Sequence, residues 1–238
     1  MPNDDIIHNV RRLADTLDTK IQITNKGRTL NEIDNRIGTL SNPSKMPGHA
    51  WSISAHRCIT GAKLRQLPNT PCSKCYAHKG RYSFTNVQTA MEKRYKSWEE
   101  DSDWAILMAI RIILLGDKAF RWFDSGDLQS VKMLEDINKV AELTTKYSEH
   151  WLPTQERSIV KNFLSKNNVS PNLCIRISSS IIGDYQKTKL TGVANSYVTR
   201  DETIGDKVHL CEAKKQGNKC LTCRCCWSQQ IDVAYPLH

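Results

Sequence analysis

"AFRWFDSGDLQSVKMLEDINKVAELTTKYSEHWLP", residues 119–153, is the stretch that decides the fold class. The apolar run at 119–123 predicts a strand, the spaced apolar positions of 127–150 predict an amphipathic helix, and 150–153 predicts a second strand. Strands that alternate with helices of this length pair in parallel through right-handed crossovers. This stretch therefore predicts an α/β protein built on a parallel sheet.

The same alternation continues on both sides of that stretch. Downstream, residues 156–166 predict a helix and 173–178 a strand. Upstream, residues 50–56 alternate like a strand, while 84–100 and 102–116 predict two helices, the second ended by Gly116.

By composition the chain divides into three segments. Residues 1–47 form a polar N-terminal lead-in, in which 6–18 predicts a short helix before an irregular stretch. Residues 48–208 form the predicted catalytic core and include a three-cysteine loop at 58–75. Residues 209–238 form a cysteine-rich, metal-binding segment. Because periodicity fades from residue 181 onward, the tail is predicted to be loop-like.

Charge and cysteine content narrow the function classes. The 238 residues carry 34 Lys and Arg against 25 Asp and Glu, a formal charge of +9, which favours a polyanionic partner such as nucleic acid. The alternative is a solvated basic surface. No apolar run reaches the roughly 18 residues that span a bilayer, so we expect a soluble protein of the cytoplasm without a membrane partner. Nine cysteines in a reducing compartment indicate metal ligation or redox chemistry before disulfides.

Polar clusters follow three of the predicted strands. Because the carboxyl ends of parallel strands share one edge of the sheet, where ligands bind, these clusters predict a site. They are Asp124, Ser125, Gly126 and Asp127 after the first strand, Thr154, Gln155 and Arg157 after the second, and Ser178, Ser179 and Ser180 after the third. The alternative for the two acids is that they cap the following helix.

The cysteines fall into two groups. The preferred metal ligands are Cys211, Cys220, Cys223 and Cys226, because a C-x2-C knuckle and a second pair can close a tetrahedral zinc site. Cys225 is set aside, because it is adjacent to Cys226 and points elsewhere in most backbone conformations. The alternative is free thiols on an irregular tail. Cys174 lies in an apolar strand and is expected to be a core thiol.

The second group has Cys58, Cys72 and Cys75, with His56 and His78 nearby. Three interpretations stay open: a second zinc site completed by a histidine, half of a site shared with the C-terminal knuckle, or a three-thiolate iron–sulfur site with an open iron.

The loop at 75–84, "CYAHKGRYSF", alternates aromatic and basic side chains. Bases stack on aromatic rings while basic groups hold phosphates, so the loop is a candidate nucleic-acid contact. The candidate residues are Tyr76, His78, Lys79, Arg81 and Tyr82. The alternative is a metal-bound loop whose aromatic rings pack on the core.

Three motifs together resemble one phage and prophage family. They are "CSKCYAHKGRYSF" at 72–84, "FRWFDSGDLQS" at 120–130 and "CEAKKQGNKCLTCRCCW" at 211–227. In this order they are similar to the family catalogued as gene product 88-like, over 51–238. The resemblance gives weight to Asp127, and it makes His238 a further ligand or site residue.

A more distant resemblance bears on mechanism. "DSGDLQ" at 124–129 is similar to the "DSGGFQ" motif of tRNA-guanine transglycosylases, zinc-containing (β/α)8 barrels, and of their DNA-acting phage relatives, DpdA. Asp127 replaces the second glycine of that motif, the chain is much shorter, and the cysteine spacing differs. The resemblance implies a TIM-barrel-like sheet, complete or incomplete. It also implies a DNA guanine transglycosylase that inserts a 7-deazaguanine base, protecting phage DNA from restriction in the host cytoplasm.

The resemblance and the chemistry of base exchange assign provisional roles. Asp124 matches the acid/base, and the second carboxylate is Asp127 or Asp184. Hydrogen bonds to a base edge are expected from Ser125, Gln129 and Gln155, and contacts to a phosphate or carboxylate from Arg121 and Arg157. Two other classes compete: an iron–sulfur enzyme that uses Cys58, Cys72 and Cys75, and a non-catalytic zinc-stabilised DNA-binding protein.

Overall fold

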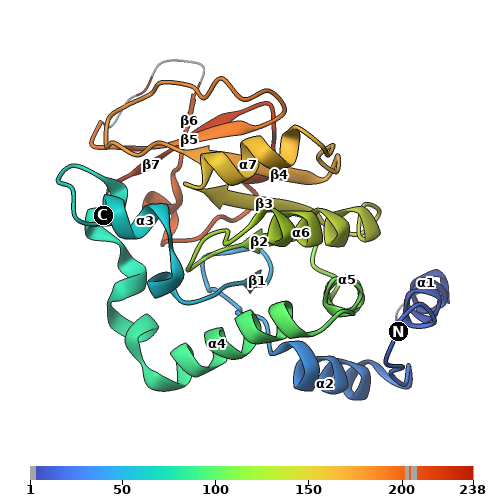
Figure 1. The fold of residues 1–238 in the computed structure, drawn as a ribbon. Coiled ribbons are helices and arrows are strands. Elements are labelled where there is room, and N and C mark those ends of the chain that lie inside the picture. Colours follow the sequence, from blue (N-terminus) through green and yellow to red (C-terminus); the bar gives the residue numbers. More distant parts are fainter. Residues whose placement is uncertain (1–3, 202–203, 205–207, 238) are drawn as a thin grey trace.

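The computed structural model describes residues 4–201, 204 and 208–237, and its core is a seven-stranded sheet (Figure 1). The strand order is β1-β2-β3-β4-β5-β7-β6, and every pair of neighbours is parallel. The strands are β1 (Ala50–Trp51), β2 (Ala119–Trp122), β3 (Glu149–Thr154), β4 (Leu173–Ser178), β5 (Ala194–Thr199), β6 (Val208–Leu210) and β7 (Asp232–Pro236). The predicted α/β class with a parallel sheet is confirmed.

The sheet is open in the part of the chain that the structure describes. Strands β1 and β6 are its two edges: among the described residues β6 pairs with β7 alone, and β1 pairs with β2 and, on its other side, only with Ser41 through a single antiparallel bridge. A closed TIM barrel is therefore not confirmed. The first five strands do follow one another in chain order across the sheet, so their crossover helices lie on the same face.

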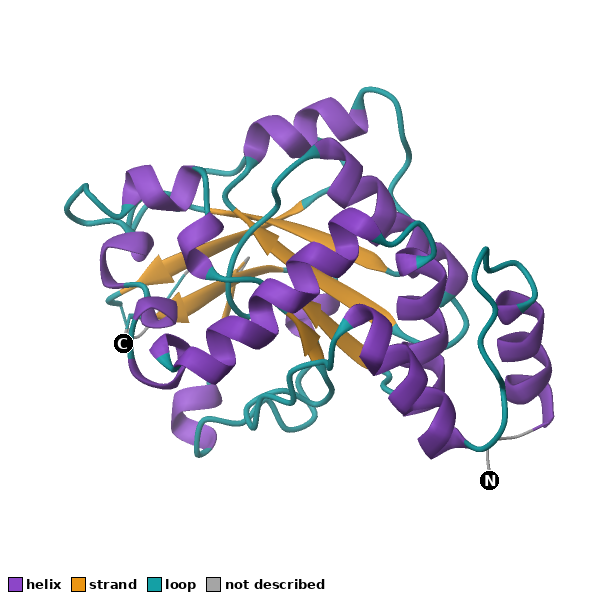
Figure 2. Ribbon diagram, turned by 60° about the horizontal axis from the view of Figure 1, so that its bottom comes forward, coloured by secondary structure: helices purple, strands orange, loops and turns teal. Residues whose placement is uncertain are grey.

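Helices cover that face in two layers (Figure 2). The inner layer has α5 (Trp104–Leu115), α6 (Val131–Leu143) and α7 (Arg157–Leu164), whereas α4 (Thr85–Glu100) adds no buried residue to this core. Helix α5 is apolar on almost all sides because it lies between the sheet and a second layer, and Gly116 ends it at φ +80° as predicted. Among the described residues, no helix combines the length and the apolar character needed to cross a membrane.

The second layer comes from the N-terminal segment. Helix α1 (Asp4–Ala14) was predicted, but α2 (Lys26–Ile37) was not. Asn25 caps α2 through the Arg28 N–H, and Ile33 and Ile37 are fully buried. Both helices contact α5, so residues 4–37 complete the main core instead of preceding it.

The prediction that the tail after residue 181 is loop-like is wrong, because β5, β6 and β7 lie there. Their polar residues hide the strand pattern. Asn195 and Ser196 in β5 are buried, and Asp232 of β7 accepts hydrogen bonds from the backbone and side-chain nitrogens of Asn195 at 2.9 and 3.2 Å. A polar strand is stable in this position because the neighbouring strand supplies hydrogen-bond partners for its buried polar groups.

Residues 211–231 of the cysteine-rich segment cover the sheet face opposite the helices. They include two short 3-10 turns, η5 (Ala213–Gln216) and η6 (Cys225–Trp227). The Trp227 ring lies edge-on to Trp151 of β3 at 5.4 Å, and its Nε1 donates to the Phe120 carbonyl at 2.8 Å. The fully buried Arg176 of β4 donates to the carbonyls of Cys225 and Ser228 at 3.0 and 2.8 Å. One buried cation therefore ties the segment to the sheet.

The turn after β2 has an unusual backbone. Phe123 has φ +55°, a left-handed conformation that bulky residues rarely adopt, and Gly126 has φ +83°. A Cβ at Gly126 would lie 2.4 Å from Ile53 Cγ1 and 2.8 Å from the Ile53 carbonyl oxygen. The turn thus presses against the chain that leaves β1, and only glycine fits at position 126.

Gly126→Ala is expected to destabilise the fold by about 3 kcal/mol, because it adds left-handed strain to an overlap with backbone. The free energy of unfolding in urea measures this loss. Gly183→Ala is the control, since Gly183 also has a positive φ of +82° but nothing within 4 Å of the added methyl group. Equal losses in the two variants would mean that close packing at Gly126 contributes nothing.

Candidate functional site

The three polar clusters meet at the carboxyl edge of the sheet. Thr154 Oγ1 donates to Asp127 Oδ1 at 2.6 Å, and the Gln155 N–H donates to Asp127 Oδ2 at 2.9 Å. Gln155 Nε2 donates in turn to the Ser179 carbonyl at 3.1 Å. Residues that follow β2, β3 and β4 are therefore joined in one hydrogen-bonded network.

Of the two acids, Asp124 and Asp127, Asp127 is the one whose carboxyl oxygens both accept hydrogen bonds. It is buried, and its Oδ1 also accepts from the Leu128 N–H at 2.8 Å, so donors already engage both of its oxygens. Burial raises the pKa of Asp127 to about 7, against the opposing effect of the hydrogen bonds from Thr154, Gln155 and Leu128. This carboxyl group holds the ends of β2 and β3 together.

The raised pKa of Asp127 predicts how the stability of the fold depends on pH. The folded protein binds the Asp127 proton more tightly than the unfolded chain, so this stabilising contribution is complete below about pH 4 and is lost as the pH rises through about 7. The unfolding free energy of the wild type should therefore fall, relative to that of Asp127→Asn, as the pH rises from 5 to 8. A difference that does not change with pH would contradict the raised pKa.

Asp124 has the opposite character. Its Oδ2 accepts from the Tyr82 hydroxyl at 3.1 Å, and its carbonyl oxygen accepts from the Tyr76 hydroxyl at 2.6 Å. Its buried Oδ1 has no hydrogen-bond partner among the described residues, and neither has the buried Ser125 Oγ. A buried polar atom without a partner is costly, and such atoms mark positions where a ligand can bind.

Neither acid caps the next helix. Helix α6 begins at Val131, later than predicted, and its N-cap is Ser130, whose side chain accepts from the Met133 N–H at 3.1 Å. The capping alternative for Asp124 and Asp127 therefore does not apply.

The other predicted substrate residues are spread around this edge. Gln129 Nε2 donates to the Asp127 carbonyl at 2.7 Å, and the exposed Arg157 donates to the Ser178 carbonyl at 3.1 Å. Arg121 lies 4.6 Å above the Trp151 ring, and its Nε has no partner among the described residues. Asp184 is on the loop after β4, where it accepts from the Gln186 N–H at 3.0 Å.

The predicted nucleic-acid loop borders Asp124. The Tyr76 and Tyr82 rings lie 5.5 Å apart, and the Tyr76 ring is exposed although its hydroxyl contacts Asp124. Lys79 and Arg81 are exposed. His78 instead contacts His56, with ring centroids 4.8 Å apart.

The loop with Cys58, Cys72 and Cys75 docks on the same edge. Buried Glu156, which the sequence interpretation missed, accepts from the N–H and hydroxyl of Thr60, both at 2.7 Å, at the start of α3 (Thr60–Leu64). Burial raises the pKa of Cys58, and the charges of Asp127 and Cys75 raise it further. The three thiols thus lie near one another and near Asp127.

The C-terminal cysteines surround a small cavity. Its volume is about 40 Å³, and its lining includes His209 and all four predicted ligands, Cys211, Cys220, Cys223 and Cys226. The tightest ligand group in the described part of the chain is a different one: the donor atoms of His209, Cys223 and Cys225 lie within 4.8 Å of one another. Cys223 belongs to both sets.

The donor atoms fit a metal ion. Tetrahedral zinc with ordinary bond lengths places a thiolate sulfur and an imidazole nitrogen about 3.6 Å apart. Cys223 Sγ and His209 Nε2 are 3.6 Å apart. Sequence interpretation missed His209, although His209 and Cys211 are two residues apart on an extended chain and so share a face. His238 lies outside the described residues.

Fold and site together define an open parallel α/β protein with an acidic strand edge and a Cys/His group that can hold a metal. The chain belongs to the Gene product 88 family, whose model matches residues 17–229. Comparison with curated proteins and with solved structures gives no match.

Proposed function

We propose that this protein is a DNA guanine transglycosylase that exchanges guanine for a 7-deazaguanine base. The observation that carries the proposal is Asp124, a buried carboxyl group at the end of β2 whose Oδ1 has no partner among the described residues. The similarity of "DSGDLQ" to the transglycosylase motif supports it.

Base exchange breaks one N-glycosidic bond and forms another. As the C1′–N9 bond breaks, its electron pair goes to the departing guanine, which takes a proton from Asp124. The incoming base returns a proton to Asp124 as its N9 bonds to C1′. Tyr82 orients this carboxyl group, because burial raises the pKa of Tyr82 and keeps its hydroxyl a donor.

Asp127 stabilises positive charge at C1′ in this proposal but does not attack it, because its oxygens already accept three hydrogen bonds. Ser125 Oγ and the amide of Gln155 supply polar contacts to the base. The C-terminal cysteines could hold a zinc ion, which would stabilise the cysteine-rich segment on the sheet; no chemical step is assigned to it.

Co-expression with a supply of 7-deazaguanine precursor, followed by mass spectrometry of the DNA nucleosides, tests the proposal. The expected result is a 7-deazaguanine nucleoside in DNA from cells with the wild-type protein. Unmodified DNA while the precursor accumulates would overturn the proposal and leave a DNA-binding role.

A second candidate is an iron–sulfur enzyme, favoured by the spacing of the loop cysteines. A Cβ at Gly61 would lie 3.7 Å from the sulfurs of both Cys58 and Cys72, so the two thiols border the same space. The three loop thiols are not within the 4.8 Å that the C-terminal group meets. One zinc ion would hold sulfurs about 3.8 Å apart, whereas a cluster with several irons spaces them more widely. Brown protein with iron and sulfide that Cys72→Ala removes would favour this candidate, and colourless zinc protein would exclude it.

A further inference from the structure

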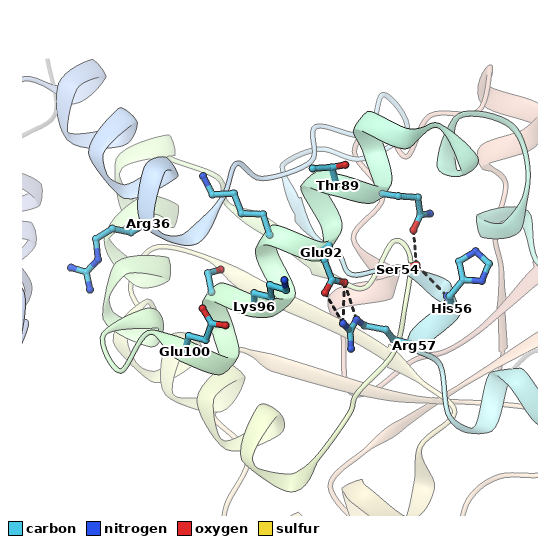
Figure 3. A pocket seen from close by; sticks show the side chains of 11 residues that line it. Arg36, Ser54, His56, Arg57, Thr89, Glu92, Lys96 and Glu100 are labelled. Atoms are coloured by element: carbon cyan, nitrogen blue, oxygen red, sulfur yellow. Dashed lines mark hydrogen bonds and ion pairs between the residues drawn. The ribbon is translucent and has the colours of Figure 1, made fainter.

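A large open cavity lies along α4, outside the strand-end network. Its volume is about 870 Å³, and Figure 3 shows its lining side chains projecting from α4, from the end of α2 and from the chain that follows β1. The α4 residues that line it run from Gln88 to Glu100, which corresponds to about 18 Å of helix. This length suits an extended chain better than one small molecule.

The lining is basic, and only part of its positive charge is neutralised. Four Lys and Arg side chains line the cavity with two Glu side chains: Arg36, Arg57, Lys93 and Lys96 against Glu92 and Glu100. The two arginines are in ion pairs, Arg57 with Glu92 at 2.8 Å and Arg36 with Asp101 at 2.7 Å.

The two lysines have no carboxylate partner among the described residues. Both are exposed. Lys93 Nζ donates to the Asp34 carbonyl at 3.3 Å, its one hydrogen bond within the described ranges. Their charges are therefore available to an anionic ligand.

Hydrogen bonds link one end of the cavity to Asp124 through Tyr82. Ser54 Oγ donates to Gln88 Oε1 at 2.7 Å, and Gln88 Nε2 donates to the Tyr82 carbonyl at 2.6 Å. The Tyr82 hydroxyl then donates to Asp124 at 3.1 Å. Gln88 of the cavity wall and the proposed acid/base thus contact the same residue, Gln88 at the Tyr82 carbonyl and Asp124 at the Tyr82 hydroxyl.

We propose that this cavity is the groove for the single-stranded DNA backbone that flanks the base at Asp124, with Lys93 and Lys96 on its phosphates. The inference rests on the proposed function for the identity of the polyanion. The exposed Tyr76 ring beside Asp124 continues the path with a surface on which a base can stack.

The test is the salt dependence of binding to a fluorescent single-stranded oligonucleotide, measured by anisotropy without any exchange reaction. Lys93→Glu/Lys96→Glu should weaken binding at least tenfold at 0.1 M salt. It should also lower the slope of log Kd against log salt by about 1.4, since each phosphate contact on a single strand contributes about 0.7.

The matched control is Lys146→Glu/Lys166→Glu, which makes the same change of net charge. Both of these lysines are exposed and lie before β3 and β4, at the opposite edge of the sheet. The control should keep the wild-type slope, and circular dichroism should show both variants folded.

Equal weakening in the two variants, or no oligonucleotide binding by the wild type, would overturn the groove. If the wild type exchanges the base and the Lys93→Glu/Lys96→Glu variant binds the oligonucleotide as tightly as the wild type does, the groove is overturned and the proposed function stands. Binding through these lysines without base exchange would keep the groove and reject the transglycosylase.

Discussion

Asp124→Asn is expected to lower the rate of base exchange by about 10³-fold, the range that loss of a general acid/base covers. The substitution keeps the shape of the side chain, and its amide oxygen can still accept from the Tyr82 hydroxyl. Because Oδ1 has no partner among the described residues, an amide group there breaks no hydrogen bond of the fold. Incorporation of an isotopically labelled 7-deazaguanine into DNA measures the rate, and urea unfolding measures the stability.

Asp127→Asn is the matched comparison, because it makes the same chemical change three residues away. The Asp127 side chain accepts three hydrogen bonds. In the Asn variant an NH2 group replaces one of the two oxygens, so at least one donor loses its acceptor, at a cost of about 1–3 kcal/mol. We expect the main effect of this variant to be a lower free energy of unfolding, with activity reduced only as far as the folded fraction falls. Full exchange by Asp124→Asn, with activity lost in a stably folded Asp127→Asn, would reverse the two roles.

Cys223→Ala is expected to remove one equivalent of bound metal and to loosen the cysteine-rich segment. Cys223 belongs both to the predicted quartet and to the tighter group with His209 and Cys225, so the loss is expected for either ligand set. Structural zinc supplies on the order of 10 kcal/mol to the folding of small modules, so the segment should become sensitive to protease. Metal analysis of purified protein and limited proteolysis measure the two effects.

Single variants then separate the ligand sets. If His209, Cys223 and Cys225 hold the ion, Cys225→Ala loses metal and Cys220→Ala keeps it, and the opposite result selects the quartet. Cys174→Ala is the control, because Cys174 is a buried thiol of β4 that belongs to neither set. A full metal equivalent in Cys223→Ala would contradict a metal centre at this position.

The parts of the fold that sequence could predict are those with strong periodicity. The β2–α6–β3 unit follows from its apolar pattern, and Gly116 ends α5 as its position indicates. The later strands could not be found in this way, because β5 buries Asn195 and Ser196, whose partners Asp232 and Ser178 come from the neighbouring strands β7 and β4. Barrel closure is likewise undetermined by local pattern, because it depends on whether the two edge strands meet.

The candidate site divides similarly. Sequence order was enough to place Asp124, Asp127 and Gln155 after neighbouring strands, because parallel strands share a carboxyl edge. It could not tell the two acids apart, because Asp127 acquires its donors from β3, which is distant in sequence. His209 was missed for a related reason: its neighbours Cys223 and Cys225 are distant in sequence and approach it only when the chain after β6 folds back on that strand.

The position of β7 between β5 and β6 has a consequence for biosynthesis. In the described part of the chain, strand β6 pairs only with β7, which is synthesised later, so β6 has no neighbouring strand until residues 232–236 have emerged from the ribosome. His209 is on β6, so its approach to Cys223 is set only after β7 has paired with β6. Metal loading is therefore expected to follow the synthesis of β7, and the nascent chain must keep its thiols reduced until then.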